Sequence, residues 1–235
     1  MIHKRRYEPA VPTSVPPPRT PMHAVARWCI LPLVKTSIMP NHITHLRLLT
    51  GIGAAVAFGV GNYFWSAWGG AMFFISAMLD RADGELARVA DRATPGGHWY
   101  DLACDMIVNV LVFLGIGVGL REQMGWWGPV MGGVAGLSVG VTFLIVFRLH
   151  ALGTHPSTAF KLPIYFDLDD SLFLVSFCAW LKVLLPLLVA SAIAAPLFLI
   201  IVLWRSRQVA SQAGSNPVPC TTSPRREQIP GSNAV

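Results

Sequence analysis

Long apolar segments occupy most of the chain between residue 43 and residue 204, and few charged residues interrupt them. An α-helix rises about 1.5 Å per residue, so about 20 apolar residues are enough to cross the roughly 30 Å hydrocarbon core of a bilayer. Only 13% of the residues are Asp, Glu, Lys or Arg, whereas ordinary soluble chains carry about 25%. The sequence therefore excludes an ordinary soluble enzyme and predicts an all-α, polytopic membrane helix bundle.

The lengths of the apolar runs predict six transmembrane helices. Their approximate ranges are 45–62, 65–90, 98–120, 127–148, 171–187 and 189–204. Ahead of them, residues 22–38 mix apolar and basic side chains, as an N-terminal amphipathic helix lying along the membrane surface would. Residues 1–21 are rich in proline and residues 206–235 are polar, so we expect a disordered leader and a disordered tail around a membrane domain at 22–205.

The positions of the 18 Lys and Arg residues predict the orientation of the chain in the membrane. With six spans both termini lie on one side, and all but two of these residues fall on that side. The exceptions are Arg121, on the opposite side, and Lys182, inside the fifth predicted span. We therefore expect both termini on the cytoplasmic side. The net charge of +6 does not indicate a nucleic-acid partner, because the basic residues flank apolar runs and form no aromatic-interleaved basic face.

Four carboxylates lie within the predicted membrane helices, where a charged side chain is unfavourable unless a partner compensates it. Asp80 and Asp83 fall on one face of the second helix and Asp101 and Asp105 on one face of the third, since a helix turns by about 100° per residue. An uncompensated Asp costs roughly 2.5 to 3.5 kcal/mol at the centre of a membrane helix on insertion scales. Two Mg²⁺ ions would balance the four charges, and hard oxygen ligands suit Mg²⁺, with Mn²⁺ as the alternative. Such a metal pair stabilises phosphate oxygens during in-line displacement.

The alternative is that these acids are ordinary charges at helix ends in the membrane interface. The spacing of the neighbouring residues favours the metal site. Gly84 follows Asp83 directly and Gly97 precedes Asp101 by one turn, so backbone or ligand can come close to both helices. Arg88, one turn beyond Gly84, is able to hold a phosphate.

The eight polar and small residues of this stretch follow one continuous spacing, D-x2-D-G-x2-A-R-x8-G-x3-D-x3-D. It is filled by Asp80, Asp83, Gly84, Ala87, Arg88, Gly97, Asp101 and Asp105. This pattern resembles the signature of the CDP-alcohol phosphatidyltransferase family, and six spans after an amphipathic helix match that family's architecture along residues 22–205. A shorter PNxxT, at Pro40, Asn41 and Thr44, is also similar to the family.

The resemblance implies a transferase that moves the phosphatidyl group of a CDP-linked lipid, normally CDP-diacylglycerol, to an alcohol or alcohol-phosphate acceptor and releases CMP. It implies metal ligation by Asp80, Asp83 and Asp101, and a double role for Asp105 as ligand and as the general base. It also assigns the cytidine diphosphate site to Asp83, Gly84, Ala87, Arg88, Gly97, Asn41 and Thr44. The active site would open on the cytoplasmic side, and a homodimer is a candidate assembly, although small-residue steps at Gly132, Gly136 and Gly140 are expected to pack within one subunit.

The acceptor is less clearly marked than the donor. Arg148 and Lys161, on the predicted cytoplasmic side, and Lys182 are candidates for binding it, although residues of this kind more often only set topology. Glycerol 3-phosphate, inositol phosphate, inositol, serine, choline and lipid alcohols all serve relatives. The form DGELAR is similar to that of inositol-phosphate-using members, but Glu85 lies outside the defining pattern and does not identify the acceptor.

Two other classes of function compete with the enzyme. A transporter or cation channel could use the intramembrane acids as an ion path, but transporters typically have repeated halves, and here the acidic motif occurs once. An inactive scaffold related to the family would be expected to have lost motif positions, and all eight are intact. The sequence therefore favours the transferase.

Overall fold

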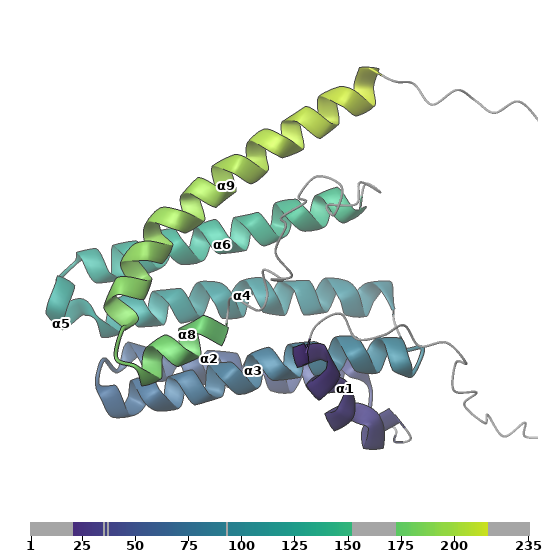
Figure 1. Cartoon of the computed structure of the whole chain (residues 1–235), viewed down its shortest axis with the longest axis horizontal. Coiled ribbons are helices and arrows are strands. Elements are labelled where there is room, and N and C mark those ends of the chain that lie inside the picture. The colour runs from purple at the N-terminus through teal and green to yellow at the C-terminus, as the bar shows by residue number, and fades with distance from the viewer. Residues whose placement is uncertain (1–20, 35, 37, 93, 152–172, 216–235) are drawn as a thin grey trace, which may run out of the picture.

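A computed structural model describes residues 21–34, 36, 38–92, 94–151 and 173–215, and within them the secondary structure is helical without strands. The helices in chain order are α1 (Pro21–Val34), α2 (Pro40–Gly59), α3 (Tyr63–Val89), α4 (Pro95–Gly119), α5 (Arg121–Met124), α6 (Trp127–Ala151), α8 (Phe173–Trp180) and α9 (Leu184–Ser215). Figure 1 shows α2, α3, α4 and α6 running alongside one another, with α9 leaning away at one end and α1 beside one end of α3. The prediction of an all-α bundle is confirmed.

Helix α2 holds the site-bearing helices together. It packs against both α3 and α4, whereas among the described residues α3 and α4 make few contacts with each other. α4 packs in turn against α6, α6 against α9, and α8 against α3. The consequence is that residues on α3 and α4 face each other across α2, so a side chain of α2 can reach both.

Glycines permit the close approach of α4 to its two neighbours. A Cβ atom at Gly115 would collide with the backbone of Ala55 on α2. A Cβ atom at Gly132, on α6, would lie 2.5 Å from the carbonyl oxygen of Phe113 on α4. Gly136 and Gly140 likewise face α4, at Val110. The small-residue steps of α6 therefore pack within the subunit, as predicted.

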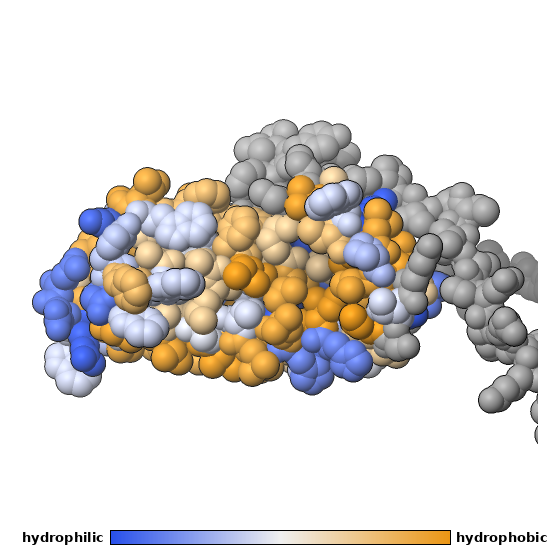
Figure 2. All heavy atoms as spheres, turned by 90° about the horizontal axis from the view of Figure 1, so that it is seen from below, coloured by the Kyte–Doolittle hydropathy of each residue, from blue (hydrophilic) through white to orange (hydrophobic). Residues whose placement is uncertain are grey.

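The outer surface of the bundle is apolar. Large side chains such as Leu49, Val56, Leu137 and Ile200 are more than half exposed, as expected for helices that face lipid rather than water. Figure 2 shows hydrophobic residues across the middle of one face and hydrophilic residues gathered at the left end, where Figure 1 places α5. Three helices, with spans at 96–119, 127–145 and 184–207, are long and apolar enough to cross a membrane.

The interfacial helix predicted at 22–38 corresponds to α1, which docks on the end of α3. Ala26 and Ile30 are buried, and Ile30 packs in a cluster with Leu86 of α3. On the other side of α1, Trp28 is 75% exposed and Leu31 is 53% exposed. One edge of α1 is thus fixed to the bundle while large apolar side chains point away from it.

The C-terminal part of the chain differs from the prediction in two places. Lys182 does not lie inside a span: it is exposed, has a φ of 61°, and sits in the joint between α8 and α9. Helix α9 continues to Ser215, so residues 206–215 are helical and not part of a disordered tail. Helix α9 continues past its apolar part because adding a residue to an existing helix is much easier than starting one, and Arg205 and the polar residues after it are compatible with a helix. The remainder of the predicted tail and residues 1–20 of the leader lie outside the described residues.

Candidate active site

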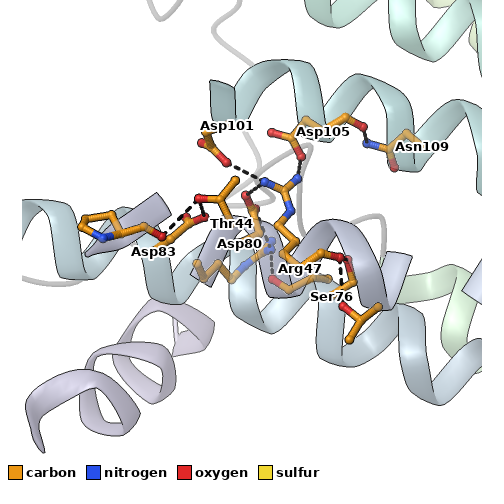
Figure 3. A network of polar contacts seen from close by, with 12 residues as sticks. Thr44, Arg47, Ser76, Asp80, Asp83, Asp101, Asp105 and Asn109 are labelled. Carbon is orange, nitrogen blue, oxygen red and sulfur yellow. Dashed lines mark hydrogen bonds and ion pairs between the residues drawn. The ribbon is translucent and has the colours of Figure 1, made fainter. Parts of the chain in front are cut away.

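Three of the four motif aspartates meet at one end of the bundle. Asp80 comes from α3, and Asp101 and Asp105 come from successive turns of α4 (Figure 3). One carboxylate oxygen from each lies within 4.8 Å of the others, which is close enough for a shared cation. The i, i+4 spacing on α4 places its two carboxylates on one face, and that face is turned toward α3.

A buried arginine of α2 fills the centre of this group. The Nη1 atom of Arg47 lies 2.9 Å from Asp80 Oδ1 and 2.6 Å from Asp101 Oδ1, and its Nη2 atom pairs with Asp105. Arg47 is 3% exposed, while the side chains of its three partners are 18% to 31% exposed, so the guanidinium is buried and the carboxylates stay open to solvent. We call Asp80, Asp101, Asp105 and Arg47 the acidic cluster. Three carboxylates share the guanidinium of Arg47, and Arg81 lies 3.6 Å from Asp80 as a second cation, so carboxylates still outnumber guanidiniums here.

Sequence reasoning missed Arg47, because it was counted only among the basic residues that set topology. A signal was available. Arg47 lies inside the first predicted span, 45–62, where a charged residue is costly unless it has a partner. The partners, however, are on two helices distant in sequence, and only the packing of α2 between α3 and α4 identifies them.

Further contacts fix the helices around the acidic cluster. Ser76 of α3 donates a hydrogen bond of 3.0 Å to the backbone carbonyl of Arg47, and Asn109 donates one of 3.0 Å to the carbonyl of Asp105. Asp80 also lies 3.6 Å from Arg81, whose guanidinium is 4.6 Å from the ring centre of Phe173 on α8. These contacts join α2, α3, α4 and α8 at the site, so the carboxylates are held on packed helices rather than on loops.

The fourth motif aspartate is held separately. Asp83 is 3% exposed and accepts a hydrogen bond of 2.7 Å from the hydroxyl of Thr44 on α2. It is not one of the three carboxylates whose oxygens gather within 4.8 Å. The contact explains why a threonine of the PNxxT segment belongs to the same site as the aspartate motif, although 39 residues separate the two.

A cavity of about 260 Å³ opens beside the acidic cluster. It is lined by the seven positions expected to form the cytidine diphosphate site, namely Asn41, Thr44, Asp83, Gly84, Ala87, Arg88 and Gly97, and also by Asp101, Pro40, Arg92, Thr94 and His98. Two cations, Arg88 and Arg92, and two carboxylates, the buried Asp83 and the partly exposed Asp101, therefore line one space. This combination suits an anionic ligand held with the help of a metal ion.

The glycines of the motif keep this cavity open. A side chain at Gly84 would extend toward Arg88, whose Nη2 atom lies 4.0 Å from an ideal Cβ position. At Gly97 a Cβ atom would lie 3.1 Å from the amide oxygen of Asn41. Gly97 also donates its backbone N–H to the hydroxyl of Thr94, which caps the start of α4 at 3.0 Å. A larger residue at either glycine would reduce the space or shift its lining.

A second group of ion pairs borders the cavity, and it contains the residue that the motif left without a role. Glu85 is 1% exposed and pairs with Arg27 of α1 and with Arg88 of α3. We call Arg27, Glu85 and Arg88 the basic cluster, because two guanidiniums share one carboxylate. Nearby, Arg92 donates to the carbonyl oxygens of Ile38 at 2.7 Å and Thr36 at 3.1 Å, and so ties the end of α3 to the segment before α2.

Of the predicted acceptor residues, only Lys182 has a described side chain, and that side chain lies far from this site. The ammonium of Lys182 lies 4.1 Å from the ring centre of Tyr63, the first residue of α3. Asp80 is 17 residues further along that helix, or about 25 Å away at about 1.5 Å per residue, so an acceptor role for Lys182 does not fit. Arg148 lies on α6, but its side chain is outside the described residues, and so is Lys161.

Comparisons with known proteins agree with this geometry. The sequence profile of the CDP-alcohol phosphatidyltransferase family matches residues 37–205, which include the whole motif and α2. The bifunctional IPC transferase and DIPP synthase of Aquifex aeolicus is 33% identical over 94 residues, which are 40% of this chain and 21% of that protein. The phosphatidylinositol phosphate synthase of Mycobacteroides abscessus is 29% identical over 118 residues, 50% of this chain and 46% of that protein. The chain thus spans less than half the length of each of these curated relatives.

A solved structure has the same fold. The crystal structure of phosphatidylinositol phosphate synthase from Mycobacterium tuberculosis with CDP-DAG bound superimposes with a TM-score of 0.55. The match covers 84% of this chain and 95% of that one at 19% sequence identity, so it shows a common membrane-helical fold.

Proposed function

This chain belongs to the CDP-alcohol phosphatidyltransferase family, and from that premise we propose that it moves the phosphatidyl group of CDP-diacylglycerol to an alcohol acceptor and releases CMP. One observation carries the proposal: all seven positions expected to bind cytidine diphosphate line a single cavity, and the carboxylate cluster lies beside it. The product of such a reaction is a phospholipid, so the chain would act in phospholipid biosynthesis as an integral membrane enzyme.

We propose that the donor binds through the charged residues that line the cavity. Arg88 and Arg92 would face the phosphates, and Asn41, Thr44 and the glycines would border the cytidine and its diphosphate. The diphosphate bridges the basic side of the cavity and the acidic side, because Asp83 and Asp101 line it as well. The exposed apolar surface of the bundle leaves the acyl chains in lipid.

The acidic cluster has the chemistry of a divalent-cation site. Its three carboxylates offer hard oxygen ligands in excess over the single guanidinium of Arg47, which suits Mg²⁺, or Mn²⁺ as the alternative. We propose that Asp80, Asp101 and Asp105, with Asp83, hold two such ions. Bound metal would stabilise the negative charge on the diphosphate and on the departing CMP. Arg47 would then share the carboxylates with the ions or turn away from them.

In the proposed reaction the oxygen of the acceptor hydroxyl forms a bond to the phosphorus of the phosphatidyl group. The bond between that phosphorus and the oxygen of CMP breaks, and CMP leaves with the electron pair. The hydroxyl proton passes to the carboxylate of Asp105, which is the general base. Asp105 is 18% exposed and so remains within reach of a bound acceptor.

The topology that accompanies this proposal has six spans. They include α2, α3, α4, α6 and α9, and α8 is the described part of the remaining span. By the distribution of Lys and Arg, the termini and the cavity mouth face the cytoplasm. A water-soluble acceptor would then reach Asp105 without crossing the membrane. Assembly as a homodimer stays a prediction, to be read from the mass of the purified protein in detergent.

The acceptor proposed first is an inositol phosphate, because two of the matched proteins are called phosphatidylinositol phosphate synthases. Their names describe those proteins, and this chain is compared with each over only part of its length or at low identity. Glycerol 3-phosphate, inositol, serine, choline and lipid alcohols therefore belong in the same test. Arg148 and Lys161 stay candidates for holding the phosphate of such an acceptor.

The transporter reading is less well supported. An ion path needs carboxylates open to passing cations, whereas the acidic cluster is tied by Arg47 to a central helix. The cavity also contains two arginines, which suit an anion and repel a cation.

The test is CMP release by the full chain, purified in detergent and given CDP-diacylglycerol, Mg²⁺ and each acceptor in turn. We expect CMP that depends on one acceptor and disappears with a chelator and in Asp105→Asn. Glu122→Gln is the matched control, because Glu122 is an exposed acid of α5 at the other end of the bundle. Folded protein that binds Mg²⁺ but releases no CMP with any acceptor would overturn the proposal and return weight to an ion path.

A further inference from the structure

A fully buried carboxylate that the proposed reaction does not use lies next to the cavity. Glu85 is 1% exposed, on the face of α3 that α1 covers. Removing a carboxylate from water is unfavourable unless it is paired and hydrogen-bonded, so a buried glutamate requires partners of opposite charge. Its neighbours in the fold are therefore informative about its role.

The two oxygens of Glu85 are divided between two arginines. Arg27 of α1 donates from both Nε and Nη2 to Oε2, each at 2.8 Å. Arg88 donates from Nη2 to Oε1 at 2.7 Å. Arg27 is 58 residues from Glu85 in the sequence, so this pairing depends on the docking of α1 against α3.

Only one of the two arginines lines the cavity. Arg88 borders it and is 34% exposed, whereas Arg27 does not line it and pairs with the other oxygen of Glu85. An ion pair between residues three apart on an exposed helix face contributes little, because the side chains are free to move. Here the glutamate is buried and also paired with Arg27, so its other oxygen holds the guanidinium of Arg88 in one place before a ligand binds.

The guanidinium of Arg88 brings positive charge to the cavity lining. Its N–H groups are the kind of donor that binds phosphate oxygens. A side chain that is already ordered loses less conformational entropy on binding, which strengthens binding without a new contact.

We propose that Glu85, held by Arg27, is a positioning residue that pre-orders Arg88 for the diphosphate of the CDP-linked donor. The inference rests on the proposed function, because the cavity must bind such a donor. It adds a role for α1: the helix on the outside of the bundle completes the donor site through Arg27. Because Ala26 and Ile30 are buried on either side of Arg27, the docking of α1 sets the position of its guanidinium.

The main experiment measures binding of CDP to the full chain in detergent with Mg²⁺, by calorimetry. Glu85→Gln keeps the size of the side chain and removes its charge, and we expect it to weaken CDP binding about tenfold. Arg27→Ala is expected to weaken it in the same direction but less. In turnover with CDP-diacylglycerol, KM for the donor should rise while kcat changes little, because neither residue touches the reacting atoms.

A double-mutant cycle separates positioning from a general loss of structure. If Glu85 acts through Arg88, then Glu85→Gln should have little further effect on CDP binding in the Arg88→Ala background. An equal loss in both backgrounds would overturn the proposal. Because Glu85→Gln could also disturb folding, Arg27→Ala, on a surface helix, is carried through the same cycle and must show the same loss of effect.

Two further results keep the failure of this inference distinct from the failure of the proposed function. Arg121→Ala, which removes an exposed arginine at the other end of the bundle, is the matched control and should bind CDP as the unmodified chain does. If the unmodified chain binds CDP and Glu85→Gln binds it equally well, only the positioning role is overturned. If the unmodified chain binds no CDP, the proposed function itself is overturned, and the positioning role with it.

Discussion

Two groups of ion pairs lie about one turn apart on α3, and they differ in the balance of their charges. In the acidic cluster three carboxylates share Arg47, whereas in the basic cluster Arg27 and Arg88 share Glu85. Among the described residues, carboxylates outnumber guanidiniums in the first group and guanidiniums outnumber carboxylates in the second. The sign of each excess suits a divalent cation for one and a phosphate for the other.

In these two groups the ratio of acidic to basic residues indicates the kind of ligand better than the presence of an ion pair does. Glu85 and Arg47 are buried, and removing a charge from water costs several kcal/mol, as an order of magnitude. Asp101 and Arg88 bring the two unequal groups to the lining of one cavity, where a metal-bound diphosphate would suit both.

The largest effect is expected from a substitution in the acidic cluster, at the residue that is proposed to take the proton. Asp105→Asn removes the proposed base and should lower CMP release by about 10² to 10⁴-fold, the usual contribution of general acid–base catalysis. CDP binding should fall far less than turnover, because the basic cluster and the other proposed metal ligands remain. The measurement is acceptor-dependent CMP release beside CDP calorimetry on the same preparation, and a loss of CDP binding equal to the loss of turnover would contradict the separation of the two clusters.

The next prediction tests whether Arg47 supplies positive charge that Mg²⁺ can replace. Arg47→Gln leaves three partly exposed carboxylates without their shared partner and should reduce stability in the absence of Mg²⁺, by less than the roughly 3 to 5 kcal/mol that breaking a fully buried pair costs. Added Mg²⁺ should restore much of this loss, because the ions neutralise the same oxygens. The measurement is the thermal unfolding midpoint in detergent across a range of Mg²⁺ concentrations, with Arg121→Gln as the control.

A loss of stability in Arg47→Gln that is the same at every Mg²⁺ concentration would show that Arg47 acts by packing alone. A loss that Mg²⁺ relieves in both Arg47→Gln and Arg121→Gln would show a general effect of ionic strength. Neither variant changes a residue of the basic cluster, so this experiment tests the acidic cluster alone.

A smaller effect is expected on the basic side. Arg88→Ala removes hydrogen bonds to charged oxygens and should weaken CDP binding by about 1.5 to 3 kcal/mol, the range for hydrogen bonds to charged groups. The stabilisation by Mg²⁺ without CDP should be unaltered. Parallel calorimetry with CDP and thermal unfolding with Mg²⁺ alone would check this, and a joint loss of both responses would mean that the two clusters form a single unit.

The smallest effect concerns the hydrogen bond between Thr44 and Asp83, which belong to neither cluster but line the same cavity. Thr44→Val keeps the shape of the side chain but removes the hydroxyl that donates to Asp83, and it should cost about 1 kcal/mol of stability. Thr50→Val is the matched control, since Thr50 donates only to backbone carbonyls of its own helix. Equal unfolding midpoints for Thr44→Val and Thr50→Val would argue against any special role for the Thr44–Asp83 bond.

Much of the fold could be predicted from the sequence because run length and helical periodicity are local properties. Four of the predicted spans correspond to α2, α3, α4 and α6 with ends shifted by a few residues. The prediction was wrong at Lys182, since one lysine in an apolar run does not mark a break, and the backbone there turns with a positive φ. It was also wrong at residues 206–215, where a polar segment continues a helix that apolar turns have already started.

The site divides in the same way. The spacing of Asp101 and Asp105 on one helix determines that they share a face, and the sequence alone was sufficient for that. Arg47 and Arg27 were not found, because nothing in the sequence near them indicates which carboxylate each one meets. Their partners are 33 and 58 residues away or more, on helices whose neighbours are set by packing.

By itself, then, the sequence determined the membrane-helical class, the spacing of the aspartate motif and the face that each aspartate takes, because each depends on residues within a few turns of one helix. Only the tertiary structure decided that α2 separates α3 from α4, that Arg47 sits among three carboxylates and that α1 delivers Arg27 to Glu85. These depend on which helix faces close against each other, and that choice is made by side-chain packing over the whole bundle.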